Sequence, residues 1–260
     1  MNIAVVTGAS SGIGRRFAKM MDNEKLDEVW AVALDQQGLD ELKGEMNTPI
    51  KTFAIDLTDL KNLESFKNKL AEVKPNINWL VNASGFGKFG RYDEIPVEQS
   101  MNMIDLNCRA LVAMTEYCLP YMTAGARIVE IASVAGFQPI PYINVYGATK
   151  AFVVSYARAL NVELKSRKIS VTCVCPFWTK TAFFNRAEDP KNKIVSYYAA
   201  LYEPQDVVNK AYKDAVKRKE LSICGFIARS QVRLVKVLPP KMIMNTWLSQ
   251  QKLKKKYKNK

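Results

Sequence analysis

A tyrosine and a lysine four residues apart, Tyr146 and Lys150, are the residues of this sequence whose types and spacing could do chemistry. On a helix the two share one face, so the ammonium group can lower the pKa of the phenol and make the phenol a usable acid or base. The sequence contains no histidine. That composition excludes Ser-His-Asp hydrolysis, Cys-His proteolysis and every dehydrogenase that moves its proton through imidazole.

A glycine-rich run near the amino terminus could hold the phosphates of a dinucleotide. The run is Thr7-Gly8-Ala9-Ser10-Ser11-Gly12-Ile13-Gly14, between an expected strand that includes Ile3–Val6 and an expected helix. Gly8 would allow a tight turn, Gly12 the close approach of the backbone to pyrophosphate, and Gly14 the close packing of helix on strand. Glycine-rich turns also serve purely structural ends, so the run alone leaves both interpretations open.

Short apolar, strand-like runs alternate with stretches of helical period along the chain. This alternation predicts an α/β protein with a parallel sheet covered on both faces. The clearest helix has an apolar stripe from Leu60 to Val73, with Thr58 as its expected N-cap. The later expected strands are Val29–Leu34, Thr52–Ile55, Trp79–Asn82, Arg127–Ala132 and Ser170–Cys175.

With 260 residues, 48% of them hydrophobic, the chain can bury one full core. We expect a dinucleotide-binding and catalytic region at 1–225 and an apolar and basic helical extension of the same domain at 226–260. Three interpretations of the extension remain open: a helix that closes over the substrate site, a subunit interface, or an amphipathic helix at a membrane surface. A packed lid or interface is favoured. The second apolar stripe of the extension consists of Met242, Ile243, Met244, Trp247, Leu248 and Leu253.

The formal net charge of +13 is concentrated at the carboxyl terminus, where six lysines lie in the last nine residues. We expect a solvated tail, with the steering of anionic partners as the alternative. Neither a signal-peptide pattern nor an apolar run of about 18 residues is present, so we expect a soluble, cytoplasmic protein. The tail lysines are Lys252, Lys254, Lys255, Lys256, Lys258 and Lys260.

The five cysteines predict free thiols. An odd number in a chain of this length argues against a disulfide-stapled secreted fold. Cys173 and Cys175 would point to one side of an expected strand, but without histidine or two further nearby thiols a zinc site lacks ligands. We therefore expect buried thiols and no metal.

Several separated motifs together resemble those of the short-chain dehydrogenase/reductase family and follow one another in that family's order. Ser133 lies thirteen residues before Tyr146, and Pro176 lies thirty residues after it, both spacings typical of the family. The resemblance covers about residues 1–220 and implies one Rossmann-type doubly wound parallel β-sheet with helices on both faces. The motifs are the run at 7–14, Asp56-Leu57, Asn82-Ala83-Ser84-Gly85, Asn107, Ser133, Tyr146-x-x-x-Lys150 and Pro176 through Thr181.

The resemblance implies roles for the matching positions. Asp56 and Leu57 would bracket the adenine, and Thr181 would contact the nicotinamide amide. Ala83-Ser84 replaces the family's usual Asn-Ala, and Phe177 stands where glycine usually follows the proline. The implied cofactor contacts are Thr7, Gly8, Ser10, Ser11, Gly12, Ile13, Gly14, Ala33, Asp56, Leu57, Asn82, Ala83, Gly85, Tyr146, Lys150, Pro176, Thr179 and Thr181.

The implied catalytic residues are Asn107, Ser133, Tyr146 and Lys150. Hydride reduction of a carbonyl leaves an alkoxide that a nearby side-chain acid must protonate. Lys150 and the positive nicotinamide would pull the Tyr146 pKa from about 10 toward neutrality, and Lys150 would also hold the nicotinamide ribose. Ser133 would donate to the substrate oxygen, and by resemblance Asn107 would hold a water that joins Lys150 to solvent.

The end of the second strand decides between NAD and NADP, because an acidic side chain there accepts from the ribose 2′-hydroxyl and repels a 2′-phosphate. Ala33 occupies that position, and Leu34 stands where NADP enzymes often have arginine. Asp35 could favour NAD, whereas Arg15 or Arg16 could favour NADP. NADP is preferred because no acid occupies the aligned position.

We therefore expect an NAD(P)-dependent oxidoreductase that interconverts a ketone and a secondary alcohol. The alternative is a non-catalytic dinucleotide-sensing module that binds protein partners. We expect a small-molecule substrate and no nucleic acid; membrane contact is not favoured, and the resemblance implies a homodimer or homotetramer. Aromatic residues expected around the nicotinamide suggest a steroid-like substrate or an acyl chain: Phe86, Phe89, Tyr142, Phe177, Trp178, Phe183 and Phe184.

Overall fold

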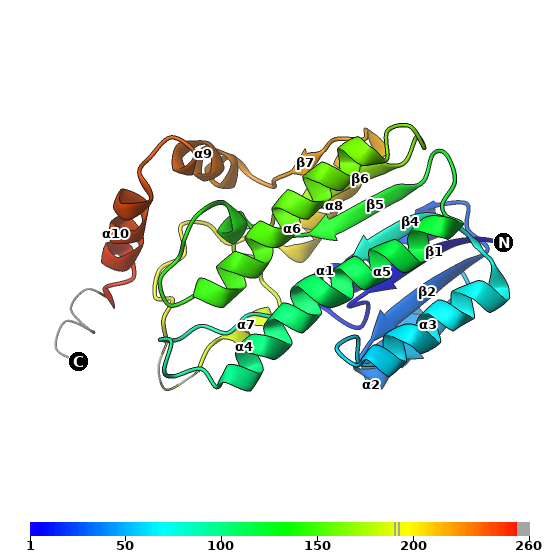
Figure 1. Cartoon of the computed structure of the whole chain (residues 1–260), viewed down its shortest axis with the longest axis horizontal. Helices are drawn as coiled ribbons and strands as arrows, with labels where there is room; N and C mark the ends of the chain where they lie inside the picture. The colour runs from blue at the N-terminus through cyan, green and yellow to red at the C-terminus, as the bar shows by residue number, and fades with distance from the viewer. Residues whose placement is uncertain (190, 192, 254–260) are drawn as a thin grey trace.

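A parallel β-sheet forms the centre of the molecule (Figure 1). The computed structural model describes residues 1–189, 191 and 193–253, so the predicted tail from Lys254 onward lies outside the described residues. Within that part of the chain the sheet has seven strands in the order β3-β2-β1-β4-β5-β6-β7, all pairs parallel. The strands are β1 Asn2–Thr7, β2 Glu28–Ala33, β3 Ile50–Ala54, β4 Asn76–Asn82, β5 Arg127–Ile131, β6 Ser170–Val174 and β7 Leu221–Ser222.

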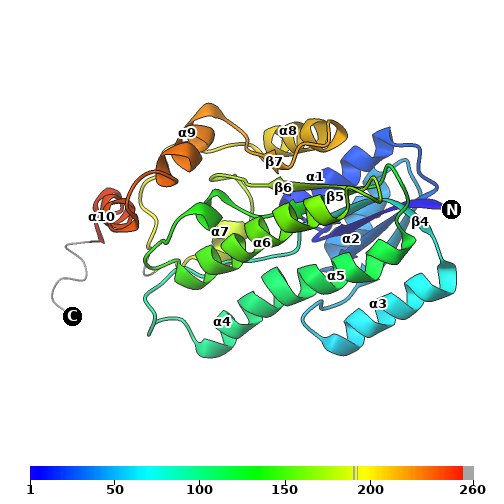
Figure 2. The same cartoon turned by 45° about the horizontal axis from the view of Figure 1, so that its top comes forward.

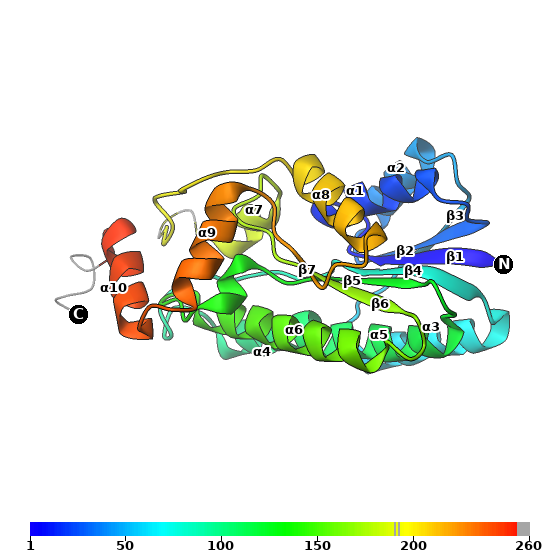
Figure 3. The same ribbon diagram turned by 90° about the horizontal axis from the view of Figure 1, so that it is seen from above.

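Helices cover both faces of the sheet, as the views in Figures 2 and 3 show. On one face lie α1 (Gly12–Met20), α2 (Gln36–Glu45) and α8 (Pro204–Val216). On the other lie α3 (Leu60–Val73), α4 (Val97–Ile104), α5 (Leu111–Cys118) and α6 (Asn144–Glu163). Three more helices lie beyond the carboxyl ends of the strands: α7 (Phe183–Ala187), α9 (Phe226–Val235) and α10 (Pro240–Gln250).

Shorter helical segments complete the described chain. A π-helical segment, Asp105–Ala110, joins α4 to α5, and single 3-10 turns occupy Met21–Asn23, Leu119–Tyr121 and Val134–Phe137. None of the helices in the described part of the chain is long and apolar enough to cross a bilayer.

The predicted parallel α/β architecture is confirmed, because strands enclosed on both faces read as continuous apolar runs. In β1 and in β2 five of six residues are buried. One predicted cap is wrong. Asp59, rather than Thr58, caps α3, with its carboxylate accepting a hydrogen bond from the Lys61 amide at 2.8 Å. The Thr58 hydroxyl instead donates to Asp56 at 2.8 Å.

The strand order reverses beside β1, and this reversal determines where a ligand can bind. The chain fills the sheet outward from β1 to β3 and then returns to place β4 on the other side of β1. The connections leave the two sides in opposite directions, which opens a crevice at the carboxyl ends of the strands.

A buried glutamate, Glu130, lies within the sheet on β5. Its Oε1 accepts hydrogen bonds from Asn82 at 3.1 Å and from Thr115 at 2.9 Å. Its Oε2 has no hydrogen-bond partner within the described part of the chain. Burial raises the pKa of Glu130 to about 8, against the lowering effect of the two hydrogen bonds. The carboxyl group is therefore mostly protonated at neutral pH.

Replacing this carboxyl by an amide should remove the pH dependence of stability that Glu130 causes. The unfolded chain ionises Glu130 near its ordinary pKa of 4.5, whereas the folded chain keeps the proton up to about 8. The neutral Glu130 carboxyl therefore adds to the free energy of unfolding at low pH. This contribution is lost as the pH rises through the interval, by up to ~1.4 kcal/mol per pH unit. We expect Glu130→Gln to lose less stability than the wild type over this range in denaturant unfolding. Parallel losses in the two proteins would show that Glu130 is ionised when folded.

Candidate active site

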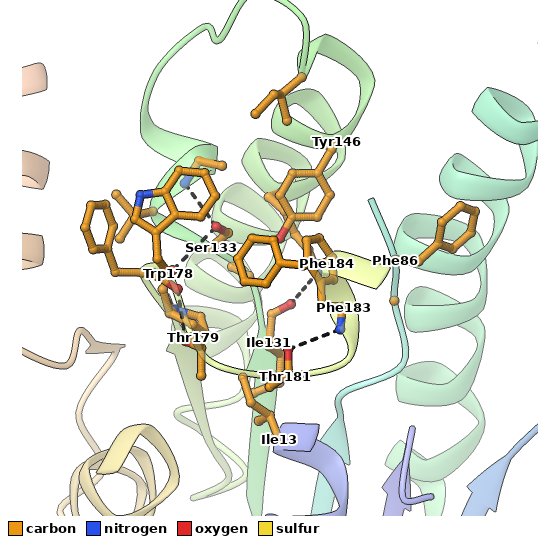
Figure 4. A pocket seen from close by; sticks show the side chains of 18 of the residues that line it. Ile13, Phe86, Ile131, Ser133, Tyr146, Trp178, Thr179, Thr181, Phe183 and Phe184 are labelled. Carbon is orange, nitrogen blue, oxygen red and sulfur yellow. Dashed lines mark hydrogen bonds between the residues drawn. The ribbon is translucent and has the colours of Figure 1, made fainter. Parts of the chain in front are cut away.

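A cavity of about 1170 Å³ opens at the carboxyl ends of the strands, where the crevice lies. Its walls come from the glycine turn, from the loops that follow the strands, and from α6, α7, α9 and α10 (Figure 4 shows part of it). The tertiary structure therefore brings together segments that span almost the whole described sequence. The predicted residues that line it are Gly8, Ser10, Ser11, Gly12, Ile13, Gly14, Ala33, Asp56, Leu57, Ala83, Gly85, Ser133, Tyr146, Lys150, Pro176, Thr179 and Thr181.

The glycine turn is as tight as its sequence predicts. Gly8 and Gly12 have positive φ angles of 66° and 54°, a region that favours glycine. A Cβ atom on Gly14 would lie 2.2 Å from the carbonyl oxygen of Gly8. Helix α1 thus begins directly against β1, and its first amide groups are directed at the cavity as an anion site requires.

Three predicted residues do not line the cavity: Thr7, Asn82 and Asn107. The Thr7 hydroxyl accepts hydrogen bonds from the amides of Ala83 and Ser84, at 3.0 and 3.1 Å. Asn82 donates to Thr115 and Glu130 inside the sheet. Thr7 thus holds the end of β1 to the segment after β4, and Asn82 holds β4 to α5 and β5. Direct contact with a cofactor stays a prediction for both residues.

Asn107 links the loop after β4 to α6. Its Oδ1 accepts from the Phe86 amide at 3.0 Å, and its Nδ2 donates to the Phe86 carbonyl at 2.9 Å and to the Thr149 hydroxyl at 3.0 Å. The residue is fully buried in the π-helical segment, a local widening of the helix that often occurs at functional sites. Sequence reasoning missed Thr149, although it lies between Tyr146 and Lys150.

Tyr146 and Lys150 come from the first two turns of α6. The Lys150 ammonium donates to the carbonyl oxygen of Ile131 at 2.8 Å and lies 5.8 Å from the centroid of the Tyr146 ring. The Ser133 hydroxyl lies near the Tyr146 hydroxyl and lowers the pKa of the phenol. Ser133 caps the 3-10 turn after β5 by accepting from the Ala135 amide at 3.1 Å. In Figure 4 the Tyr146 side chain points from its helix into the pocket.

Burial dominates the electrostatics of this pair. Burial raises the pKa of Tyr146 to about 12, and the nearby Ser133 hydroxyl offsets only part of that rise. Burial also lowers the pKa of Lys150 to about 8. Desolvation favours the neutral form of both groups, and the lowering of the Tyr146 pKa by Lys150 together with the positive nicotinamide stays a prediction.

Aromatic side chains surround the reactive end of the cavity, as the sequence predicted. The Phe183 and Phe89 rings lie 5.4 and 6.2 Å from the Tyr146 ring, centroid to centroid. Six of the seven predicted aromatic residues line the cavity, and Tyr142 does not. The Tyr146 ring thus lies among other aromatic rings at this end of the cavity.

Helices α9 and α10 cover the far end of the cavity and contribute to its wall, as the lid interpretation expects. Trp247 of α10 is buried, stacks on Trp178 at 6.3 Å between centroids, and donates its indole N–H to the Pro141 carbonyl at 3.0 Å. Gln251, buried just after α10, accepts from the amides of Ser196 and Tyr197 at 2.8 and 3.0 Å. Sequence reasoning missed Gln251, since a lone glutamine in a polar tail carries no signal.

The two arginines considered for a 2′-phosphate do not line the cavity. Arg15 donates to the carbonyl oxygens of Ser10 and Gly38 and to Glu45, at 3.2, 2.9 and 2.9 Å. Asp35 lines the cavity and caps α2 by accepting from the Gly38 amide at 3.2 Å. The geometry therefore gives no support for a 2′-phosphate site at Arg15 or Arg16.

No group of three or more cysteine, aspartate and glutamate side chains that could hold a metal ion occurs within residues 1–189, 191 and 193–253. All five cysteines are free, and the sulfur atoms of Cys173 in β6 and Cys175 directly after it lie 3.7 Å apart. Four of the five are buried.

A doubly wound parallel sheet with a glycine turn at its switch point defines a dinucleotide-binding α/β protein. The short chain dehydrogenase family matches residues 2–192. The chain is 34% identical over 176 residues to an uncharacterized oxidoreductase of Staphylococcus epidermidis, covering 67% of this chain and 76% of that protein. This protein therefore belongs to the short-chain dehydrogenase/reductase family.

Two further similarities concern activity and cofactor. The chain is 30% identical over 188 residues to a very-long-chain 3-oxoacyl-CoA reductase of Bos taurus, covering 68% of this chain and 59% of that protein. It is similar to a short-chain dehydrogenase from Sphingobium yanoikuyae solved in complex with NADPH, with a TM-score of 0.76 and 27% identity over 92% of this chain and 97% of that one. The protein is an NAD(P)-dependent oxidoreductase of small molecules.

A methyl group at position 14 should disrupt the cofactor turn, because it would meet the Gly8 carbonyl oxygen at 2.2 Å. We expect the free energy of unfolding of Gly14→Ala to be about 1–3 kcal/mol lower than that of the wild type, and we expect the variant to bind NAD(P)H more weakly. Gly44→Ala is the matched control, since nothing lies within 4 Å of a Cβ atom there. Thermal unfolding and the fluorescence of bound NAD(P)H measure both effects. Equal behaviour of the two variants would contradict the tight packing of α1 on β1.

Proposed function

We propose that this protein interconverts a ketone and a secondary alcohol, with Tyr146 supplying the proton in the direction of reduction. The single observation that carries the proposal is the grouping of Tyr146, Ser133 and Lys150 in the wall of a cavity that also contains the glycine turn. The Tyr146 and Ser133 hydroxyl groups lie near each other in this wall, so one substrate oxygen could meet both.

The residues of the glycine turn fit a dinucleotide. The absence of side chains at Gly8, Gly12 and Gly14 leaves a cradle of backbone amides at the start of α1, which would hold the pyrophosphate. Asp56 and Leu57 would hold the adenine end, and Thr181, whose methyl carbon would lie 3.5 Å from a Cβ atom on Gly12, would lie beside the nicotinamide. When bound, the nicotinamide supplies or accepts the hydride.

Tyr146 holds its proton at neutral pH, since burial raises its pKa to about 12. A protonated phenol is the form that reduction requires, and the developing alkoxide is a much stronger base than phenolate. In this mechanism Ser133 donates to the carbonyl oxygen, and Tyr146 transfers its proton to that oxygen as negative charge develops there. The bond between the phenol oxygen and its hydrogen breaks as the alcohol O–H bond forms.

Lys150 stabilises the phenolate that remains. Its ammonium group has three N–H donors, of which Ile131 accepts one. The remaining donors are available to the nicotinamide ribose and to the proton path that restores Tyr146. Asn107 holds α6 in position through Thr149 and would hold the water that leads to solvent.

The substrate in this proposal is apolar, such as an acyl chain or a steroid. Support comes from the rings of Phe89, Trp178 and Phe183 around the reactive end and from the apolar wall that α9 and α10 add. The similarity to a 3-oxoacyl-CoA reductase agrees with an acyl chain. We also propose NADPH as the preferred cofactor, since Ala33 leaves no carboxylate at the end of β2 and the similar Sphingobium yanoikuyae enzyme holds NADPH.

Removal of the Tyr146 hydroxyl tests the proposed function directly. We expect wild-type protein to oxidise NADPH in the presence of apolar ketones, and Tyr146→Phe to lose at least about 100-fold in kcat, because general acid catalysis contributes that much. The Kd for NADPH should change little. A variant that keeps its turnover would remove Tyr146 from the mechanism, and wild-type activity confined to small polar sugars would contradict the apolar substrate.

The pH dependence of reduction tests the role of Lys150. The lysine is charged below its pKa of about 8 and neutral above it, so the phenolate loses its stabilising cation as the pH rises. We expect kcat for ketone reduction to fall above about pH 8, with the loss of a single proton. The same fall should persist in Glu130→Gln, which removes the other buried group that titrates near 8. A profile that stays level to pH 10 would contradict a charged Lys150 in the rate-limiting step.

A further inference from the structure

Helices α9 and α10 expose a row of large apolar side chains at the end of the molecule farthest from the amino terminus (Figures 1 and 3). Phe226 is 74% exposed and Val237 is 79% exposed. In α9, Phe226 and Leu234 lie eight residues apart and so on the same stripe, with Ile227 beside them. We call this row the apolar row; its members are Phe226, Ile227, Leu234, Val237 and Met242.

The opposite faces of the same helices are packed against the protein. Ala228 and Val232 of α9 are buried in the main core, and Trp247 of α10 is buried in the cluster around the aromatic wall. Ile243 of α10 is buried as well and lines the cavity. The two helices therefore lie along the surface with one face fixed on the protein and the other directed outward.

Basic residues flank the apolar row. Arg229, Arg233, Lys236 and Lys241 are all exposed. The sequence from residue 221 to residue 260 contains ten lysines and arginines and no aspartate or glutamate. An apolar row with basic residues beside it and no acidic ones is the pattern of helices that lie in the interface of an anionic bilayer.

The apolar row also borders the cavity. Phe226, Ile227, Leu234 and Met242 line the cavity wall while remaining largely exposed to solvent. These residues therefore lie where the cavity wall meets solvent, and they give that part of the wall an apolar edge. Large exposed apolar surfaces are uncommon on monomers and mark sites of contact.

We propose that the outer face of α9 and α10 docks on an anionic lipid bilayer and that the cavity opens toward the membrane. The apolar row enters the boundary between headgroups and acyl chains, and the flanking cations pair with lipid phosphates. This contact goes beyond the proposed reaction, since it concerns how an apolar substrate arrives. It does not require turnover, so it can be tested independently of the reaction.

Charge decides between a bilayer and a second copy of this chain. A symmetric contact through this face would bring two sets of cations together with no carboxylate from residues 221–260 to pair with them. An anionic lipid surface supplies both the negative charge and the apolar medium that the row needs.

Flotation of the purified full chain with lipid vesicles tests the proposal. The probes are vesicles of phosphatidylcholine alone and of phosphatidylcholine mixed with phosphatidylglycerol. We expect binding to the mixed vesicles at low salt, at least tenfold weaker binding to phosphatidylcholine alone, and weakening as salt rises. Val237→Asp and the double variant Arg233→Glu/Lys241→Glu should each bind the mixed vesicles at least tenfold more weakly than the wild type. None of these residues lines the cavity, so the variants should leave the reaction unaffected.

Matched controls use exposed residues elsewhere. Val162→Asp alters a valine that is 59% exposed on α6, and Lys25→Glu/Lys43→Glu changes the same charge at exposed lysines just before β2 and on α2. Both controls should bind as the wild type does, and all variants should reduce a short soluble ketone equally. Absence of binding, or equal binding by Val237→Asp and Val162→Asp, would overturn the proposal. So would light scattering that shows Val237→Asp converting a dimer to a monomer with vesicle binding unchanged.

Discussion

The hydrogen bond from the Lys150 ammonium to the Ile131 carbonyl is the contact on which the site depends. It ties α6 to the carboxyl end of β5 and so determines where Tyr146, one turn earlier, meets Ser133 just after β5. The bond is made in a buried environment, where an amine shifts toward its neutral form. With a pKa of about 8, the Lys150 amine can gain or lose a proton near neutral pH. Such a group suits a site in which a neighbouring phenol loses its proton.

The polar contacts around this bond extend through the core in two directions. Asn107 joins the loop after β4 to Thr149 of α6 and so links the two segments that flank the reactive end. On the other side, Glu130 accepts from Asn82 and Thr115, which fixes β4, β5 and α5 relative to one another. Breaking one of these hydrogen bonds would leave a further unpaired group in a low-dielectric interior, which is costly.

The C-terminal helices α9 and α10 have two different faces. Their inner face, with Ile243 and Trp247, completes the apolar wall, and their outer face carries Phe226 and Val237 into solvent among cations. A role of these helices as a lid is therefore compatible with the proposed membrane contact. One pair of helices can serve both purposes because a helix presents different residues on its two sides.

The sequence by itself determined the parallel sheet, the glycine turn and the tyrosine–lysine pair. Each rests on local spacing: apolar runs for strands, a glycine where a Cβ atom would collide, and four residues for one turn of helix. Only the tertiary structure decided that Arg15 pairs with Glu45. It likewise decided that Thr7 accepts from the Ala83 amide and that Asn82 donates to Glu130. It also decided that burial raises the Tyr146 pKa. These properties depend on which groups from distant segments surround a side chain and how much water they exclude, and no spacing along the chain records that.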